Sequence, residues 1–197
     1  MNADVAVLAL HYQNDVLHAD GKIKVGMKED SDRRRVLDAA GRLLEGARAR
    51  GVPIMHVRIA FRPDYADCPT NTPIFRKTIE LGAVRDGDWG AEFVQELAPL
   101  ASRNEFVLTH TRISAFAGTA LEQTLRMLGV RRLVIAGVAT HSVVENSVRE
   151  GADLGYEITV AADACAAAQA DIHKAALASM SLVAGIMDVD EVLAALG

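Results

Sequence analysis

Short apolar runs alternate along the chain with longer stretches that have one apolar face. Five of the runs are rich in β-branched residues, as buried strands are: residues 4–10, 53–59, 105–109, 132–136 and 157–161. Between them, apolar residues recur every three or four positions, which predicts helices: residues 31–50, 118–128 and 171–181. Strands and helices alternate about six times, with a last strand–helix pair at the end. This order predicts right-handed crossovers and an α/β fold. We expect a three-layer αβα sandwich whose Rossmann-like sheet has about six strands and is mainly parallel.

The run at residues 132–136 leads into a tight elbow. Gly137 ends the run, and residues 138–140 form the turn. Thr140 or Ser142 is expected to cap the helix that follows. An elbow of this kind presents backbone N–H groups at the carboxyl end of a parallel sheet, where open α/β sheets bind small molecules.

The stretch at residues 60–90 lacks a regular pattern and contains three prolines. Connections of this length inside a compact domain are usually lids or binding loops. We expect a short helix at residues 91–97 after it. Near the amino end, residues 18–28 read as a polar loop, and Asp30 or Ser31 as the cap of the long helix.

Composition narrows the class of protein. The 197 residues suit one domain, residues 1–197, and the 50% hydrophobic but only 5% aromatic content fits helices covering a sheet. A net charge of −5 argues against a nucleic-acid partner. No 18-residue apolar run or basic leader is present, so we expect a cytoplasmic protein without a membrane partner. Cys68 and Cys165 do not form a disulfide framework, and no sequence neighbour would activate either thiol.

Two histidines follow predicted strands and could carry chemistry. His11 and His110 each lie at the carboxyl end of a strand, near the elbow around Val143. Two imidazoles that converge there can exchange protons near neutral pH. The alternative is that each histidine is a hydrogen-bonded structural residue.

A metal site is a further possibility that the sequence supports only weakly. It would combine His11 and His110 with His56 or His141, but no HxH or HExxH spacing is present. Gly137 alone does not make a glycine-rich phosphate loop. We therefore expect neither a metal nor another cofactor.

Three motifs show a family resemblance: HYQND at residues 11–15, HTRISAFAGT at 110–119 and GVATHSVV at 137–144. They resemble the D-x-Q-N-D, K-x-R-x-S-A-F-x-G-T and G-[IV]-x-T-[DH]-x-C-V motifs of the isochorismatase-like hydrolase superfamily. Residues 152–156 and 163–166 extend the resemblance over nearly the whole chain. The resemblance implies a homodimer or homotetramer. It also implies a non-proline cis peptide at the elbow, Val138–Ala139, with the amides of Ala139 and Val143 facing a substrate oxygen.

The same resemblance shows where this chain departs from its relatives. Cysteine amidohydrolases of the superfamily use an Asp-Lys-Cys triad, and here His11, His110 and Val143 occupy those positions. Valine cannot act as a nucleophile, so an acyl-cysteine mechanism at this site is excluded. Isochorismatases proper lack the cysteine as well, which shows that the scaffold can work by acid–base chemistry, but they keep the Asp and the Lys.

The main hypothesis is a hydrolase that acts without cysteine on a small carbonyl- or carboxylate-bearing molecule. His11 would be the general acid or base, His110 would bind or stabilise negative charge, and the amides of Ala139 and Val143 would polarise the substrate. The candidate substrate-binding residues are Tyr12, Gln13, Trp89, Arg112 and Phe116. One alternative is a catalytically silent ligand-binding or oligomeric relative, and another is metal-assisted chemistry.

Overall fold

The computed structural model describes residues 4–23 and 30–196, with residues 30 and 31 described by their backbone alone. Within this part of the chain, six strands form one parallel sheet in the order β3-β2-β1-β4-β5-β6. Their bounds are β1 Val5–Leu10, β2 Ile54–Ile59, β3 Glu105–His110, β4 Arg132–Gly137, β5 Glu157–Ala161 and β6 Gly185–Met187. This confirms the predicted parallel α/β sheet.

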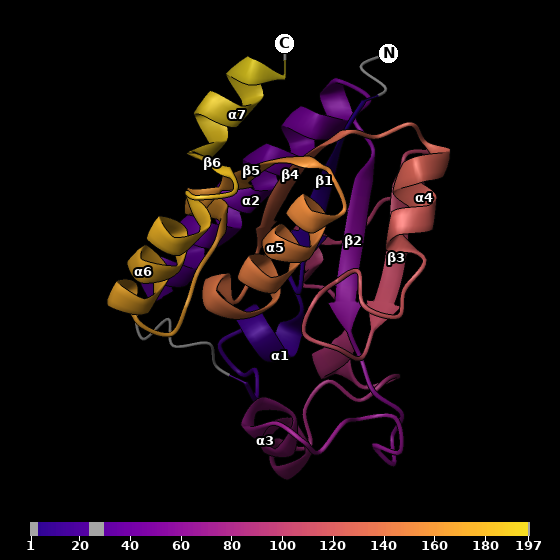
Figure 1. Cartoon of the computed structure of the whole chain (residues 1–197). Coiled ribbons are helices and arrows are strands. Elements are labelled where there is room, and N and C mark those ends of the chain that lie inside the picture. The colour runs from indigo at the N-terminus through magenta and orange to yellow at the C-terminus, as the bar shows by residue number, and fades with distance from the viewer. Residues whose placement is uncertain (1–3, 24–29, 197) are drawn as a thin grey trace.

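Helices cover both faces of the sheet. Figure 1 shows α4, α5 and α6 in front of it and α2 behind it, and α7 packs against α2. Their bounds are α1 Asn14–Leu17, α2 Asp30–Ala49, α3 Pro73–Leu81, α4 Leu121–Met127, α5 Glu145–Asp153, α6 Ala170–Met180 and α7 Val189–Ala195. Among the described helices, none has the length and apolar character that crossing a bilayer requires.

The middle of the sheet is the most buried part. Strand β1 lies between β2 and β4 and is buried along its whole length. Its last residue, Leu10, pairs with Val57 on one side and Gly137 on the other. The carboxyl ends of these strands therefore meet at one edge, the lower edge in Figure 1.

Residues 60–90 form a lobe beyond that edge, and the expectation of irregular structure there was only partly right. The lobe contains α3, which lies below the sheet in Figure 1. Pro73 starts this helix, where a missing N–H costs nothing, and Gly82 ends it in a left-handed conformation at φ 59°. The lobe has its own small core, separate from the main one, whose buried members are Phe61, Cys68, Phe75, Ala83 and Val84.

Other local predictions need correction. The expected helix at 91–97 is instead two short 3₁₀ turns, Trp89–Ala91 and Gln95–Leu97. Helix α4 begins three residues later than expected, because Gly118 has a positive φ of 73° that a helix cannot continue. Residues 24–28 of the expected loop at 18–28 lie outside the described residues. The expected caps Asp30 and Ser31 are described by their backbone alone.

Candidate functional site

A cavity of about 270 Å³ opens at the carboxyl edge of the sheet, between the elbow and the lobe. Apolar side chains form most of its lining. Its polar lining residues are His11, Thr78, Arg112, His141 and Ser142. A mainly apolar cavity with a few polar groups at the carboxyl ends of parallel strands is typical of a small-molecule site in this class of fold.

His11 is placed in the cavity wall by an unusual backbone conformation. It follows β1 directly and has a φ of 57°, in the left-handed region that only a few per cent of non-glycine residues adopt. Its N–H donates to the carbonyl oxygen of Val57 at 2.9 Å, which fixes this turn against β2. Strained backbone of this kind clusters at functional sites.

The two predicted histidines are in direct contact. Nε2 of His11 and Nε2 of His110 are hydrogen-bonded to each other, although β2 separates their strands. On the far side of its ring, Nδ1 of His110 lies 3.1 Å from the carbonyl oxygen of Ser114. His11 is 8% exposed and His110 is 2% exposed, so His110 lies behind His11 as seen from the cavity.

This chain of contacts determines the tautomer of both rings. A carbonyl oxygen can only accept, so Nδ1 of His110 carries a proton and donates it to Ser114. Nε2 of neutral His110 is then an acceptor, and His11 must donate to it from Nε2. Nδ1 of His11 is left with a lone pair and has no hydrogen-bond partner among the described residues. The histidine that lines the cavity therefore has a lone pair on Nδ1 that no described residue uses.

Burial keeps the pair neutral. Desolvation lowers the pKa of His11 well below its ordinary value, and the neighbouring His110 lowers it further. Desolvation also lowers the pKa of His110, to about 4, although its hydrogen bond to Ser114 opposes the change. Both imidazoles are thus neutral near pH 7.

The elbow forms another wall of the cavity. Its peptide bond Val138–Ala139 is cis. Gly137 has a φ of 155°, and a side chain there would collide with the carbonyl of Leu10, so only glycine fits. The N–H groups on either side are occupied, since Val138 donates to Leu10 and Thr140 donates to Ala166. The N–H of Ala139 has no acceptor within the described residues, and Ala139 lines the cavity.

One expectation about the elbow was wrong. Neither Thr140 nor Ser142 caps the following helix, which begins with a π-helical turn, Thr140–Val144. The hydroxyl of Thr140 instead bonds to Nδ1 of His173 at 2.8 Å. Val143 is 1% exposed and packs in the main core, so its side chain leaves the cavity open.

A buried carboxylate, which the sequence reading left without a role, holds the cavity in shape. Asp15 is 1% exposed and accepts hydrogen bonds from the N–H groups of Lys22, at 3.1 Å, and Val84, at 2.7 Å. Val84 lines the cavity and has a φ of 46°, which is strained for a β-branched residue. Gly90 leaves the space that this carboxylate fills. The signal in the sequence was the acid that ends the HYQND motif at residues 11–15.

Of the five expected substrate-binding residues, Arg112 alone is among the residues that line this cavity. Tyr12 is buried, and its hydroxyl donates to the carbonyl of Ala164 at 2.7 Å. Gln13 is fully buried and makes three 2.8 Å hydrogen bonds to the backbone of Ile59 and Ala91, so it joins β1 to its neighbours.

The two remaining aromatic residues lie elsewhere for different reasons. Phe116 is buried and stacks on Tyr156 in the main core, with ring centroids 6.1 Å apart. Trp89 is 52% exposed and forms a T-shaped contact with His18, with ring centroids 5.0 Å apart. The spacing of residues along the chain does not distinguish Phe116 and Trp89 from residues of the cavity wall. Which side chains line the cavity depends on how the lobe packs against the sheet.

The other candidate chemistry is dispersed. Within the described part of the chain, no group of three or more His, Cys, Asp or Glu side chains lies close enough together to hold a metal ion. His56 is bonded to Glu105 at 2.8 Å, away from the cavity. Both thiols are buried, and burial raises the pKa of Cys165 to about 12 and raises that of Cys68.

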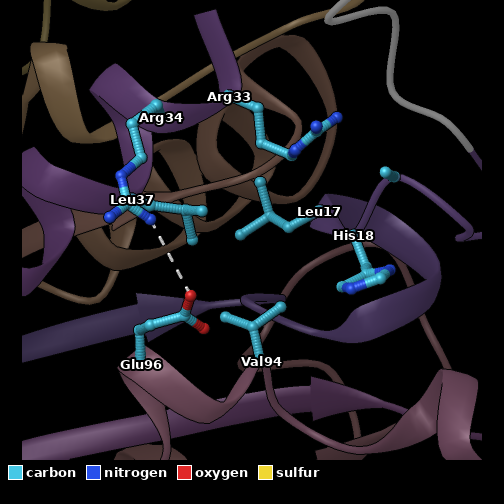
Figure 2. A pocket seen from close by; sticks show the side chains of 8 residues that line it. Leu17, His18, Arg33, Arg34, Leu37, Val94 and Glu96 are labelled. Atoms are coloured by element: carbon cyan, nitrogen blue, oxygen red, sulfur yellow. Dashed lines mark ion pairs between the residues drawn. The ribbon is translucent and has the colours of Figure 1, made fainter. Parts of the chain in front are cut away.

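A second hollow, with a volume of about 470 Å³, lies between α2 and the residues after α1 (Figure 2). Arg34 and Glu96 face each other across it at 3.9 Å, as the dashed line in Figure 2 marks, and Arg34 also pairs with Asp38. It contains neither of the paired histidines and no residue of the elbow. The smaller cavity beside His11 is therefore the stronger candidate site.

Comparison with known proteins supports the fold described above. A model of the isochorismatase domain matches residues 5–191. The uncharacterized isochorismatase family protein YecD of Escherichia coli O157:H7 is 31% identical over 166 residues, which cover 82% of this chain and 83% of that protein. The ureidoacrylate amidohydrolase RutB of Methylobacterium radiotolerans is 31% identical over 176 residues, covering 82% of this chain and 67% of RutB. The structure of a cysteine hydrolase from Pseudomonas syringae pv. phaseolicola superposes with a TM-score of 0.88 at 21% identity, covering 100% of this chain and 93% of that one, which shows a shared fold.

Proposed function

The chain belongs to the isochorismatase family of hydrolases, and on that premise we propose that it hydrolyses a small carbonyl- or carboxylate-bearing molecule without a cysteine nucleophile. The observation that carries the proposal is the free lone pair on Nδ1 of His11, held in an open cavity by His110. A histidine in this state can act as a general base toward a water molecule.

The proposed reaction has two proton transfers. Nδ1 of His11 takes a proton from water as the water oxygen forms a bond to the carbonyl carbon. The carbonyl oxygen gains negative charge, which the free N–H of Ala139 would stabilise. The backbone N–H of Val143 is the second elbow amide that we propose for this role. The bond to the leaving nitrogen or oxygen then breaks, and His11 returns its proton to that atom. His11 is neutral again at the end of the cycle.

His110 takes a different role from the one expected. Its Nε2 already accepts from His11 and its Nδ1 donates to Ser114, so neither nitrogen is available to a substrate anion. We assign it as a positioning residue. It holds the ring of His11 in one orientation and one tautomer, and it continues to accept the Nε2 proton when His11 is charged.

The catalytically silent alternative predicts that side chains fill the cavity at the former triad positions, His11, His110 and Val143. Two features support catalysis instead. Val143 packs away from the cavity, which leaves about 270 Å³ open, and the strained turn at His11 persists. The metal-assisted alternative has less support, because no group of three or more His, Cys, Asp or Glu side chains that could hold a metal ion occurs among the described residues.

A hydrolysis screen of wild type beside His11→Asn tests the proposal. The panel covers small amides, ureides, esters and isochorismate, with iodoacetamide and a chelator as controls. We expect turnover of at least one compound that resists both treatments and is lost in His11→Asn. Loss of turnover on chelation would favour a metal, and turnover that survives in His11→Asn would overturn the role of His11. Equal silence of both proteins across the panel would favour the binding-protein alternative.

A further inference from the structure

The cavity beside His11 has an uneven distribution of charge. Of the described residues that line it, Arg112 alone carries a permanent charge, and no Asp or Glu is among them. Three of its apolar walls come from strand ends and the lobe: Ile59, Phe75 and Val84. A site with one cation, no anion and apolar walls stabilises a single negative charge on a ligand.

Arg112 is held in a way that leaves part of its guanidinium available. Its Nη1 donates to the carbonyl and the hydroxyl oxygen of Thr111, at 2.8 and 2.9 Å. Its Nε and Nη2 donate to no group in the described part of the chain, and no described carboxylate pairs with it. The adjacent Nε–H and Nη2–H form the fork that binds a carboxylate through two parallel hydrogen bonds.

The rest of the cavity offers few polar partners. The hydroxyl of Thr78 donates to the carbonyl of Ile74 within α3, so it is already occupied. His141 and Ser142 lie on the elbow side of the cavity. Burying a hydroxyl or amide of a ligand against Phe75 or Val84 would leave it without a hydrogen bond, which is costly. The walls therefore favour a compact apolar group.

We propose that the site selects small monocarboxylates with a compact apolar body. Arg112 binds the carboxylate, the apolar walls enclose the body, and the reacting carbonyl lies toward His11 and the N–H of Ala139. This inference rests on the proposed function, because it takes the cavity as the place where substrate binds. The volume of about 270 Å³ is slightly below the range of about 300–1,000 Å³ typical of ligand pockets, which suits a molecule near the size of benzoate.

The test is a binding titration of the full chain, followed by calorimetry or NMR, with three probes. Benzoate has the charge and the apolar body, benzamide has the same shape without the charge, and succinate has two charges and no apolar ring. We expect benzoate to bind at least tenfold more tightly than the other two. Equal affinity for benzoate and benzamide would overturn the proposal.

Three variants locate the effect. Arg112→Gln should weaken benzoate binding about tenfold or more and leave benzamide unchanged. Arg131→Gln removes the same charge from an exposed position next to β4, far from the elbow, and should change neither. Ile74→Asp places a carboxylate at the mouth, on a 48% exposed residue in the first turn of α3 where helices tolerate acids, and should weaken benzoate severalfold. Equal effects of Arg112→Gln and Arg131→Gln on benzoate would refute the assignment of Arg112.

The titration separates this inference from the proposed function. Selective benzoate binding that depends on Arg112, without any turnover in the screen, would support the carboxylate site and reject the hydrolase. Turnover that depends on His11, with benzoate binding insensitive to Arg112→Gln, would support the hydrolase and reject the carboxylate site. His11→Asn should retain benzoate binding, because the imidazole acts on the reacting carbonyl and not on the carboxylate.

Discussion

His56 on β2 and His110 at the end of β3 are both buried, and burial is the main cause that lowers the pKa of each. Their partners differ. Nε2 of His56 donates to Glu105 at 2.8 Å, and Arg48 holds the same carboxylate through two 3.0 Å hydrogen bonds. His110 instead contacts a second neutral histidine, His11, which lines a cavity and has no hydrogen-bond partner for its Nδ1 among the described residues.

The difference teaches how surroundings assign a role to the same side chain. Around Glu105, hydrogen bonds from Arg48, the Leu100 amide and His56 overcome the effect of burial and lower the carboxyl pKa to about 2. The negative charge of Glu105 is balanced by Arg48, and all of these hydrogen bonds join groups within the protein. Around His11, a lone pair remains that the described protein does not use. A buried histidine is thus structural when its partners are complete, and a candidate catalyst when a cavity replaces one of them.

The largest expected effect separates the two histidine sites by activity. His11→Asn should lower kcat/KM by about 10²- to 10⁴-fold, because it removes the general base. His56→Asn, the matched change at the other site, should leave kcat/KM within about twofold. Steady-state kinetics on a substrate from the screen would measure both, and a similar loss in the two variants would show that the comparison is wrong.

The next prediction concerns stability at the site formed by Glu105, Arg48 and His56. Glu105→Gln should lower the free energy of unfolding by about 3 kcal/mol, because it leaves the Arg48 charge and the His56 ring without their buried partner. The specific activity of the folded protein should not change. Urea unfolding with activity measured below the transition checks this prediction, and a stability loss under about 1 kcal/mol would contradict it.

Acid should weaken the contributions of His110 and Glu105 to stability in two different pH windows. His110 binds its proton less readily in the folded protein than in the unfolded chain, so its contribution falls as pH drops from about 6.5 to 4. Glu105 has a lowered pKa in the folded protein, so its contribution is present above about 4.5 and is lost as pH falls toward 2. Unfolding measured from pH 7 to 3 should therefore show two losses of stability. His110→Gln should reduce the first loss, to which His11 and His56 also contribute because their pKa values are lowered as well. Glu105→Gln should remove the second loss.

A smaller effect isolates the positioning role of His110. His110→Ala should lower kcat about tenfold and leave KM nearly unchanged, because His11 loses the acceptor that fixes its tautomer. His110→Gln should recover part of the rate, since its amide oxygen can accept the same proton. Nitrogen-15 NMR of His11 should show one tautomer in wild type and a mixture in His110→Ala. A single tautomer in both proteins would contradict the assignment.

Periodicity was sufficient for the architecture, because apolar alternation and helical spacing reflect burial directly. It also placed His11 and His110 at strand ends, since both follow apolar runs. Their contact across β2 was beyond its reach, because it depends on the left-handed turn at His11. The pattern also misassigned Gln13 and Trp89, whose surroundings are set by long-range backbone bonds and by the lobe.

The small core inside the lobe has a consequence for how this protein can change. Phe61, Phe75 and Val84 pack among themselves, while the sheet beneath them has its own core. Substitutions in the lobe can therefore reshape one wall of the cavity at little cost to the sheet or the paired histidines. New substrate preferences can be acquired there independently of the catalytic residues, which makes the lobe the natural target for a directed-evolution library.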